Sequence, residues 1–366
     1  MIPEREPSAV AEDFVTGVVP AGVRFRLADP SATYAEVRVW LDLEHHVEPP
    51  PLVRVGHGWE TTLRRPPVLR VEYLFLVRHQ DGSEAMICDP ANSRRVTTAF
   101  GDHSVLEFPG YEAPAWLATT ASKGETVGFA VRGAGLRRTI AVTVWSPPGT
   151  TVSDPLPMLA LHDGPELAQL AAVTQFSAAM IALGRLPAHR LALVSPGHRD
   201  SWYSASLAYA HALHRSVLPA VRNVVRVGPA PVLAGVSLGA LAALHAATTF
   251  PGTWAALFLQ SGSFFRRESD GHESSFVGFD AITRYVQSLD DATEPTRRLD
   301  IGMTVGLAEE NLTNNRVMAA ALTRLGHRVT LVEVPDAHTF VGWRDALDPH
   351  LTNLLARAWT GHRDAA

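Results

Sequence analysis

The chain of 366 residues has a single cysteine, Cys88, and a single lysine, Lys123. One cysteine cannot form an intrachain disulfide, and it excludes a metal site built from several cysteines. The remaining basic residues are arginine, and the formal net charge at pH 7 is −5. A chain without an excess of positive charge lacks the strongly basic surface that is typical of proteins binding nucleic acids or acidic membranes.

Long apolar runs are also missing. No stretch reaches the roughly 18 uninterrupted apolar residues that a membrane-spanning helix requires. The first residues, MIPEREPSAVAEDF, are acidic and polar and do not contain the apolar core of a secretory signal. We therefore interpret residues 1–14 as an amino-terminal tail, and we expect no membrane partner, no nucleic-acid partner and a location in the cytoplasm.

The amino-terminal part, residues 15–118, is composed of short strand-like runs separated by turn signals. Apolar and polar residues alternate in VRFRLA and in EYLFLV, which is typical of strands with one buried face. Regularly spaced turns between such strands predict a small antiparallel β-sandwich. The segment FPGYEAPAWLA, residues 108–118, has the composition of a linker at the end of this domain.

From residue 125 the pattern changes. Apolar runs of strand length, among them PMLALH, LALVSPG and AALFLQSG, alternate with alanine-rich helical stretches. This alternation predicts an α/β domain over residues 119–366, with a mostly parallel sheet covered on both faces. In such a domain the ligand site lies at the carboxyl ends of the strands.

A serine flanked by glycines stands between strand and helix in PVLAGVSLGALAALHAATTF, residues 231–250. The pattern G-x-S-x-G in this context predicts a nucleophile elbow, with the serine hydroxyl projecting at the edge of the sheet. Gly235 and Gly239 would let strand and helix pack closely, and the N–H of Leu238 would point to a developing oxyanion. Ser237 is therefore the predicted nucleophile. The alternative is a glycine-rich turn with a capping serine.

A serine hydroxyl is a weak nucleophile and needs a base, which in α/β-hydrolases comes last in the order Ser, acid, His. There are 16 histidines in the chain. His338 directly follows the strand-like run RVTLVEVP and lies in the segment PDAHTFVGWRDAL, just before a final helix. Because this position is a loop at the carboxyl end of a strand, we predict that His338 is the base.

The acid is expected after the preceding strand, where DIGMTVGLAEENLTNNR offers Glu309 and Glu310. Either carboxylate could hold the imidazole in the required tautomer and stabilise its cation. We favour Glu309, because a glutamate at the start of the next helix also suits the helix dipole and gives Glu310 a structural role. Glu310 stays the alternative acid, and Asp336 is a third candidate.

A second oxyanion donor is expected in the loop after the first internal strand, LPMLALHDGPEL. Pro165 has no N–H, so the donor would be the amide of Gly164 or of Glu166, and we prefer Gly164. His162 and Asp163 are expected at the rim of the site. This chemistry requires no metal ion and no organic cofactor.

Together these segments resemble the enterochelin esterases, siderophore trilactone hydrolases within the esterase-D-type α/β-hydrolases. The resemblance extends over most of the chain and includes LHDGPE, AGVSLGALAALHAA, FLQSGSFF and PDAHTFVGWRDAL. It implies Ser237 as nucleophile, His338 as base and Glu309, the third residue after Gly306, as acid. It also implies that residues 15–118 form an Ig-like domain near the mouth of the active site, which could also support a homodimer.

The resemblance implies a small-molecule ester as the substrate, and we expect four residues to contact it: Asp163, Arg199, Trp202 and Trp343. Two segments depart from the family pattern. Residues 199–202 read RDSW, where relatives carry a glutamate beside the arginine, and residues 336–337 read DA, where the ferric-siderophore esterases show a glycine pair. Both changes touch the substrate pocket, so a catecholate trilactone is one of several expected esters.

We therefore predict a serine esterase that hydrolyses a carboxylic ester, such as a siderophore-type lactone, through a Ser-His-Glu triad and an acyl-enzyme. The alternatives are acyl transfer to an alcohol or sugar, and hydrolysis of acetyl or feruloyl esters of carbohydrates. A further alternative is a non-catalytic binding protein. The predicted sandwich also resembles starch-binding modules, which is consistent with a carbohydrate ligand.

Overall fold

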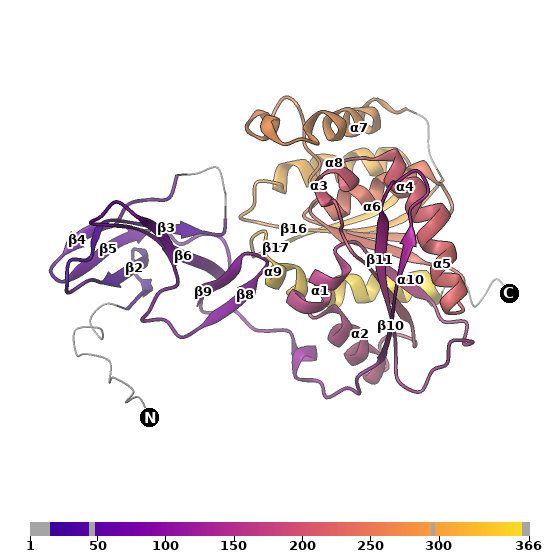
Figure 1. Cartoon of the computed structure of the whole chain (residues 1–366), viewed down its shortest axis with the longest axis horizontal. Coiled ribbons are helices and arrows are strands. Elements are labelled where there is room, and N and C mark those ends of the chain that lie inside the picture. Colours follow the sequence, from indigo (N-terminus) through magenta and orange to yellow (C-terminus); the bar gives the residue numbers. More distant parts are fainter. Residues whose placement is uncertain (1–14, 44–47, 294–296, 361–366) are drawn as a thin grey trace. The chain divides into compact units, whose positions relative to one another are not determined.

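The computed structural model describes residues 15–43, 48–293 and 297–360, and these form two compact units (Figure 1). The predicted tail, residues 1–14, lies outside the described residues. The predicted boundary between residues 118 and 119 stays a prediction.

The first unit extends to Glu112 and also includes two short segments from far along the chain, Leu307–Glu310 and Pro335–Thr339. The rest of the described chain belongs to the second unit. The two short segments carry the predicted acid and the predicted base. Nothing in their local sequence indicated that they would group with the amino-terminal residues.

Two antiparallel sheets form the first unit, in agreement with the alternation of apolar and polar residues. The strands of one sheet, in spatial order, are β1 (Gly17–Val19), β2 (Gly22–Ala28), β5 (Gly58–Leu63) and β4 (Val53–Val55). The strands of the other are β3 (Tyr34–Leu41), β6 (Arg70–His79), β9 (Gly101–Glu107) and β8 (Arg95–Thr98), with β7 (Glu84–Ile87) paired to β6.

The two sheets share one apolar core. Alternate residues of β2 and β3 are buried in this core, and Phe25 of β2 meets Tyr73 of β6 edge-to-face, with ring centroids 5.2 Å apart. Val37, Val39 and Phe75 are completely buried in the same cluster. We call residues 15–112 the amino-terminal sandwich, because two sheets packed over a common core have this architecture.

The second unit is built on a mixed sheet of eight strands. Its spatial order is β10 (Glu125–Arg132), β11 (Thr139–Ser146), β13 (Arg190–Val194), β12 (Met158–Leu161), β14 (Val232–Val236), β15 (Ala256–Gln260), β16 (Asp300–Gly306) and β17 (Arg328–Val334). The last six are parallel, whereas β10 and β11 are antiparallel to their neighbours. The short connection between β10 and β11 explains why these two strands are antiparallel to each other, since parallel neighbours need a longer crossover.

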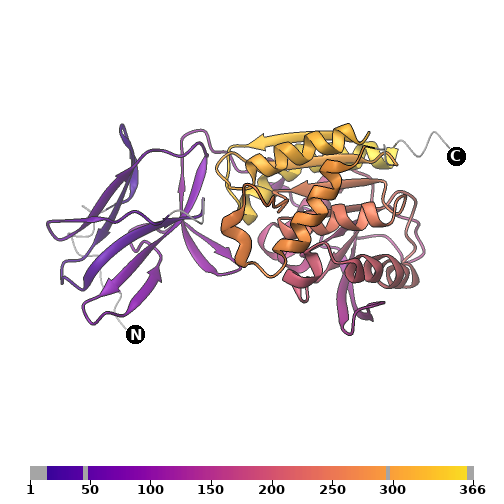
Figure 2. The same cartoon turned by 90° about the horizontal axis from the view of Figure 1, so that it is seen from above.

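Helices cover both faces of this sheet (Figures 1 and 2). Successive residues of β12 belong to two different apolar clusters, because side chains alternate across a strand. One face is covered by α1 (Gly164–Leu170), α2 (Val173–Ala182) and α10 (Thr352–Thr360), and the other by α4 (Leu207–Ala212), α5 (Leu218–Val224), α6 (Leu238–Thr249), α7 (Phe279–Asp291) and α8 (Leu312–Arg324). The short helices α3 (Arg199–Tyr203) and α9 (Phe340–Asp345) follow β13 and β17.

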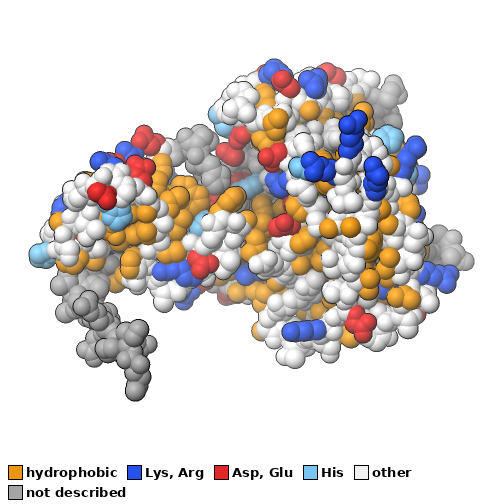
Figure 3. All heavy atoms as spheres, viewed as in Figure 1, with side chains coloured by type: hydrophobic (Ala, Val, Ile, Leu, Met, Phe, Trp, Pro, Cys, Tyr) orange, Lys and Arg blue, Asp and Glu red, His pale blue; other side chains and the backbone are white. Residues whose placement is uncertain are grey.

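The distribution of charged side chains on the surface agrees with the modest net charge of the chain. Figure 3 shows acidic and basic side chains interspersed with apolar ones on the viewed face of the second unit. No helix of the described residues combines the length and the apolar character needed to cross a lipid bilayer.

Candidate active site

Ser237 occupies the sharp turn between β14 and α6, with φ of 55° and ψ of −124°. A positive φ is uncommon for a residue with a side chain and costs on the order of 1–3 kcal/mol. The Ser237 N–H donates to the carbonyl of Gln260 on the neighbouring strand, at 2.9 Å. Such a strained backbone, held in place by its surroundings, is a feature of functional sites.

The two glycines of the turn are needed for close approach. A Cβ on Gly235 would lie 2.3 Å from the backbone carbon and oxygen of Gly239. A Cβ on Gly239 would lie 2.9 Å from Oδ2 of Asp163 and 3.1 Å from Cβ of His162. Backbone atoms at 2.3 Å cannot move aside without displacing the helix, so the strand and helix of the elbow pack as the motif predicts.

The hydroxyl of Ser237 lies 3.1 Å from the hydroxyl of Ser263, which is buried. The Ser263 N–H also donates to the Ser237 carbonyl, at 3.2 Å. The sequence reasoning did not single out Ser263. Its signal was its place three residues beyond β15, the strand next to β14, where polar side chains gather at the carboxyl ends of parallel strands.

The predicted acid and base meet within the first unit. Nδ1 of His338 lies 2.7 Å from Oε2 of Glu309, whose side chain is fully buried. With an ionised carboxylate this nitrogen donates its proton, which leaves Nε2 as the acceptor. This tautomer is the one that a general base requires, and the catalytic role of His338 stays a prediction.

The pKa of His338 is raised above its ordinary value. Burial alone would lower it, but the hydrogen bond and charge of Glu309 outweigh that effect, with help from the charges of Asp42 and Glu310. Glu310 therefore contributes to the field at the imidazole, while Glu309 makes the short hydrogen bond. Asp336 has a different position, since its Oδ1 accepts the N–H of Ala337 and its carbonyl accepts the N–H of Ala308.

Gly164, the predicted oxyanion donor, is the first residue of α1 in the second unit. A Cβ there would lie 2.4 Å from Cα of Leu193, so only glycine fits against β13. Leu238, the other predicted donor, begins α6. The first N–H groups of a helix have no partner within the helix, so both amides occupy positions suited to binding an anion. Their role, like that of the alternative donor Glu166, stays a prediction.

Asp163 and Arg199 are joined to each other. Nε and Nη2 of Arg199 donate to the two carboxylate oxygens of Asp163, at 2.9 and 3.1 Å. Asp163 is buried, and burial raises the pKa of its carboxyl although Arg199 acts in the opposite direction. His162 is also buried rather than at a rim, and its Nδ1 lies 2.9 Å from the Gly239 carbonyl. These residues hold the loop before α1 against the elbow, and a contact of Asp163 or Arg199 with substrate stays a prediction.

The two predicted aromatic contacts are largely buried. Trp202 is 6% exposed and stacks on Tyr209, with ring centroids 5.7 Å apart. Trp343 is 7% exposed, and its Nε1 donates to Oγ of Ser261 at 2.9 Å. Such burial is typical of tryptophans that pack in a core, so their contact with substrate stays a prediction.

Among the described residues of the first unit, one group has the side chains of a metal site. Asp42, Glu72 and His103 in the first unit place ligand atoms within 4.8 Å of one another. Glu72 also accepts a hydrogen bond from the buried guanidinium of Arg70, at 3.0 Å. Arg70 and Glu72, whose side chains are both buried, form an ion pair within this cluster.

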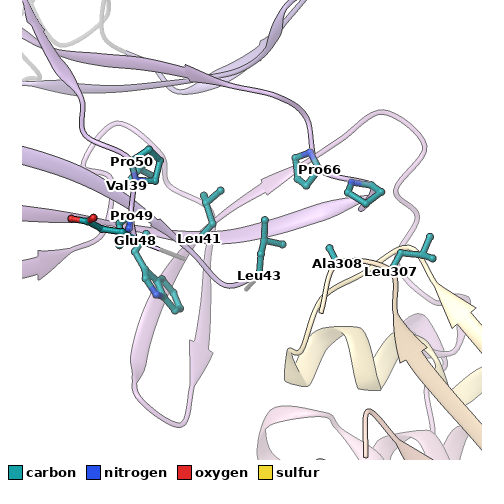
Figure 4. Close-up of a pocket in the computed structure, with 11 residues that line it drawn as sticks. Val39, Leu41, Leu43, Glu48, Pro49, Pro50, Pro66, Leu307 and Ala308 are labelled. Carbon is teal, nitrogen blue, oxygen red and sulfur yellow. The ribbon is translucent and has the colours of Figure 1, made fainter. Parts of the chain in front are cut away.

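The first unit contains an apolar pocket of about 290 Å³ (Figure 4). Its lining consists of Val39, Trp40, Leu41, Leu43, Glu48, Pro49, Pro50, Pro66, Pro67, Leu307 and Ala308. The last two residues precede Glu309 directly in the chain. An apolar cavity beside the predicted acid is suited to an apolar group of a ligand.

The mixed sheet with helices on both faces, and the strained serine after β14, define the second unit as a domain of the α/β-hydrolase type. Residues 133–354, more than half of the chain, match the model of the Esterase family, which is described as "Putative esterase". The chain therefore belongs to the Esterase family, and it is a carboxylic ester hydrolase.

Solved structures share the fold over most of the chain. Ferric enterobactin esterase from Salmonella typhimurium is 21% identical, with 96% of this chain and 97% of that chain covered and a TM-score of 0.75. An enterobactin esterase from Shigella flexneri is 20% identical, with 93% of each chain covered and a TM-score of 0.71. A ferulic acid esterase is 16% identical over 64% of this chain and 98% of its own, with a TM-score of 0.53. No curated protein sequence matches the chain.

Proposed function

We propose that this esterase cleaves its substrate through Ser237, His338 and Glu309. The observation that carries the proposal is the 2.7 Å hydrogen bond between His338 and Glu309, because it provides an oriented and electrostatically supported imidazole. The strained backbone at Ser237 supports the assignment of this residue as the nucleophile.

The order of strands and site residues along the chain supports this assignment. Strands β14, β16 and β17 are parallel, so their carboxyl ends lie at one edge of the sheet. Ser237 follows β14 directly, Glu309 comes three residues after β16 and His338 four residues after β17. Each of the three residues therefore comes shortly after the carboxyl end of a parallel strand in the chain.

The proposed reaction is a two-step acyl transfer. Nε2 of His338 takes the proton of the Ser237 hydroxyl as its oxygen attacks the ester carbonyl, and the N–H groups of Leu238 and Gly164 bind the resulting oxyanion. The imidazolium then gives its proton to the leaving alcohol, and an acyl-enzyme remains. Water repeats the sequence and releases the acid. Loss of one oxyanion donor is expected to lower kcat by about 10²–10³-fold.

For the substrate, we propose a small-molecule ester with a bulky apolar or aromatic part. The apolar pocket bordered by Leu307 and Ala308 supports this class. Two of the similar structures are enterobactin esterases, one of them in the presence of enterobactin, which favours a siderophore-type lactone. The ferulic acid esterase favours a feruloyl ester as the second candidate.

For the amino-terminal sandwich, we propose an Ig-like domain, on the basis of its two antiparallel sheets and shared core. Its participation in a homodimer stays a prediction. So does the cytoplasmic location of the protein.

The test is a panel of aryl esters, feruloyl and acetyl sugars, and macrocyclic trilactones, assayed with wild type and Ser237→Ala. We expect activity on at least one ester class, with loss of that activity in the variant. Ser263→Ala is the matched control, because it removes the neighbouring hydroxyl and leaves the nucleophile. A fluorophosphonate probe should label Ser237 in wild type and in Ser263→Ala. Labelling of Ser263 instead, or full activity of Ser237→Ala, contradicts the proposal.

A second measurement separates hydrolysis from acyl transfer. Added alcohols and sugars compete with water for the acyl-enzyme, and the products can be separated by chromatography. A hydrolase releases mainly the free acid. A predominance of the new ester at low acceptor concentration would instead identify an acyltransferase.

A further inference from the structure

The segment that carries the predicted base is held at both ends by two consecutive residues of the amino-terminal sandwich. The N–H of Leu69 donates to the carbonyl of Pro335, at 2.8 Å. Nη1 of Arg70, the next residue, lies 3.5 Å from Oγ1 of Thr339. His338 lies between these two anchor points. Leu69 and Arg70, the first residue of β6, thus contact both ends of a loop of five residues.

Arg70 is well suited to this task because it is itself immobilised. Its side chain is only 3% exposed, and Nη1 also donates to Oε1 of Glu72, at 3.0 Å. Burial acts to lower the pKa of Arg70, but the charges of Glu72 and Asp336 outweigh it and raise the pKa above its ordinary value. The guanidinium therefore stays charged, with one carboxylate on its own strand and another in the base-carrying segment.

The same contacts extend to the acid. The N–H of Ala308 donates to the carbonyl of Asp336, at 3.3 Å, which links the segment of Glu309 to that of His338. The side chain of Ala308 packs against the apolar core of the sandwich. Both halves of the pair between His338 and Glu309 are therefore organised by the first unit.

We infer that Arg70 is a positioning residue for catalysis, which holds the loop of His338 so that the imidazole stays on Glu309. This inference rests on the proposed function, since it takes His338 as the base. It assigns to the amino-terminal sandwich a part in catalysis, in addition to any contact with substrate. A buried ion pair contributes little net stability in general, and a role in fixing one conformation is a physical reason for its presence here.

The test compares Arg70→Met and Arg70→Lys in the full-length protein. Arg70→Met removes the charge and the donors, and we expect kcat to fall by about 10- to 100-fold, because small displacements of a catalytic group have effects of this size. KM should stay within about twofold, since ground-state binding of the ester is not altered. Arg70→Lys keeps the charge and should recover part of kcat.

The matched control is Arg78→Met on the same strand. Arg78 is paired with Glu36 and is much more exposed, so its loss should leave kcat unchanged. Proton NMR supplies a second readout, because the Nδ1 proton of a histidine bonded to a carboxylate resonates far downfield. This signal should shift or disappear in Arg70→Met and persist in Arg78→Met.

Several outcomes would overturn the inference. One is folded Arg70→Met with wild-type kcat; another is a higher KM with an unchanged downfield proton, which would indicate contact with substrate. If Arg70→Met does not fold, Thr339→Val tests the inference instead, because it leaves the pair of Arg70 and Glu72 intact. A severalfold loss of kcat in this variant supports the inference, and wild-type kcat refutes it. His338→Ala distinguishes a failure of the proposed function from a failure of the positioning role of Arg70. If it stays active, the proposed function fails, whereas an inactive His338→Ala beside a fully active Arg70→Met refutes only the positioning role.

Discussion

Replacement of Glu309 by glutamine isolates the carboxylate that faces the predicted base. The side chain of Glu309 is fully buried, and its Oε2 lies 2.7 Å from Nδ1 of His338. Glutamine has nearly the same shape but no charge, and it can present an N–H to the imidazole and favour the wrong tautomer. We therefore expect kcat to fall by about 10⁴-fold, as in serine hydrolases whose acid is replaced by its amide.

The same substitution has a second, independent signature in the pH profile. The hydrogen bond and charge of Glu309 raise the pKa of His338 against the effect of burial. Without them that pKa falls. Since the base must be neutral to accept a proton, kcat/KM declines on the acidic side near the pKa of the free enzyme. The acidic limb of Glu309→Gln should therefore move to lower pH, while its plateau is much reduced.

The assay is the pH dependence of kcat/KM for an aryl ester, followed by release of the phenol, with Glu310→Gln as the matched control. Glu310 also raises the pKa of His338 through its charge, so a small shift of the limb is expected, but the plateau should stay within about tenfold of wild type. If Glu310→Gln loses more activity than Glu309→Gln, the acid is Glu310 and the reasoning is wrong. Equal and small losses in both would exclude a Ser-His-Glu triad.

Three further predictions follow from the geometry. Gly235→Ala should lose about 1–3 kcal/mol of unfolding free energy or more and unfold at a lower temperature, because its Cβ meets backbone at 2.3 Å. Gly128→Ala, whose Cβ would meet its nearest atom at 3.9 Å, is the control. Equal unfolding temperatures of the two variants would contradict this account. Ser237→Gly should be more stable than Ser237→Ala by on the order of 1 kcal/mol, since glycine relieves the positive φ; denaturant unfolding measures the difference, and a less stable glycine variant would disprove the strain. Leu41→Glu places a charge in the apolar pocket and should raise KM for aryl esters about tenfold, with KM for acetyl esters unchanged. The reason is that apolar contact in the pocket is worth roughly 1.5–3 kcal/mol of binding free energy. An equal change of KM for both esters would show that the pocket does not bind the aryl group.

The elements of the fold were largely predictable from local patterns. Alternation in strands such as β2 and β6 predicted antiparallel sheets, and the apolar runs from β12 onward predicted parallel strands with helices between them. The elbow at Ser237 was predictable for the same reason, since its geometry depends on five consecutive residues and on the elements that flank them. The sequence predicted a mostly parallel sheet without indicating which strands are antiparallel, because an apolar run does not reveal the direction of its neighbour.

The partners of the polar site residues were harder to predict. The order of motifs along the chain indicated Glu309 and His338, and the structure brings them together. It also joins Asp163 to Arg199, two residues that the sequence reasoning expected to contact the substrate. A long, flexible side chain can reach several groups, so the choice among them depends on packing.

The sequence by itself determined where this protein places a strained serine, a histidine loop and an acidic loop, because each depends on a short run of residues that sets its own backbone. Only the tertiary structure decided that the two loops group with the amino-terminal sandwich, and that Arg70 reaches a residue 269 positions further along the chain. The physical reason is burial. A guanidinium removed from water is stable only beside its carboxylates, and which carboxylates are near depends on how distant strands pack.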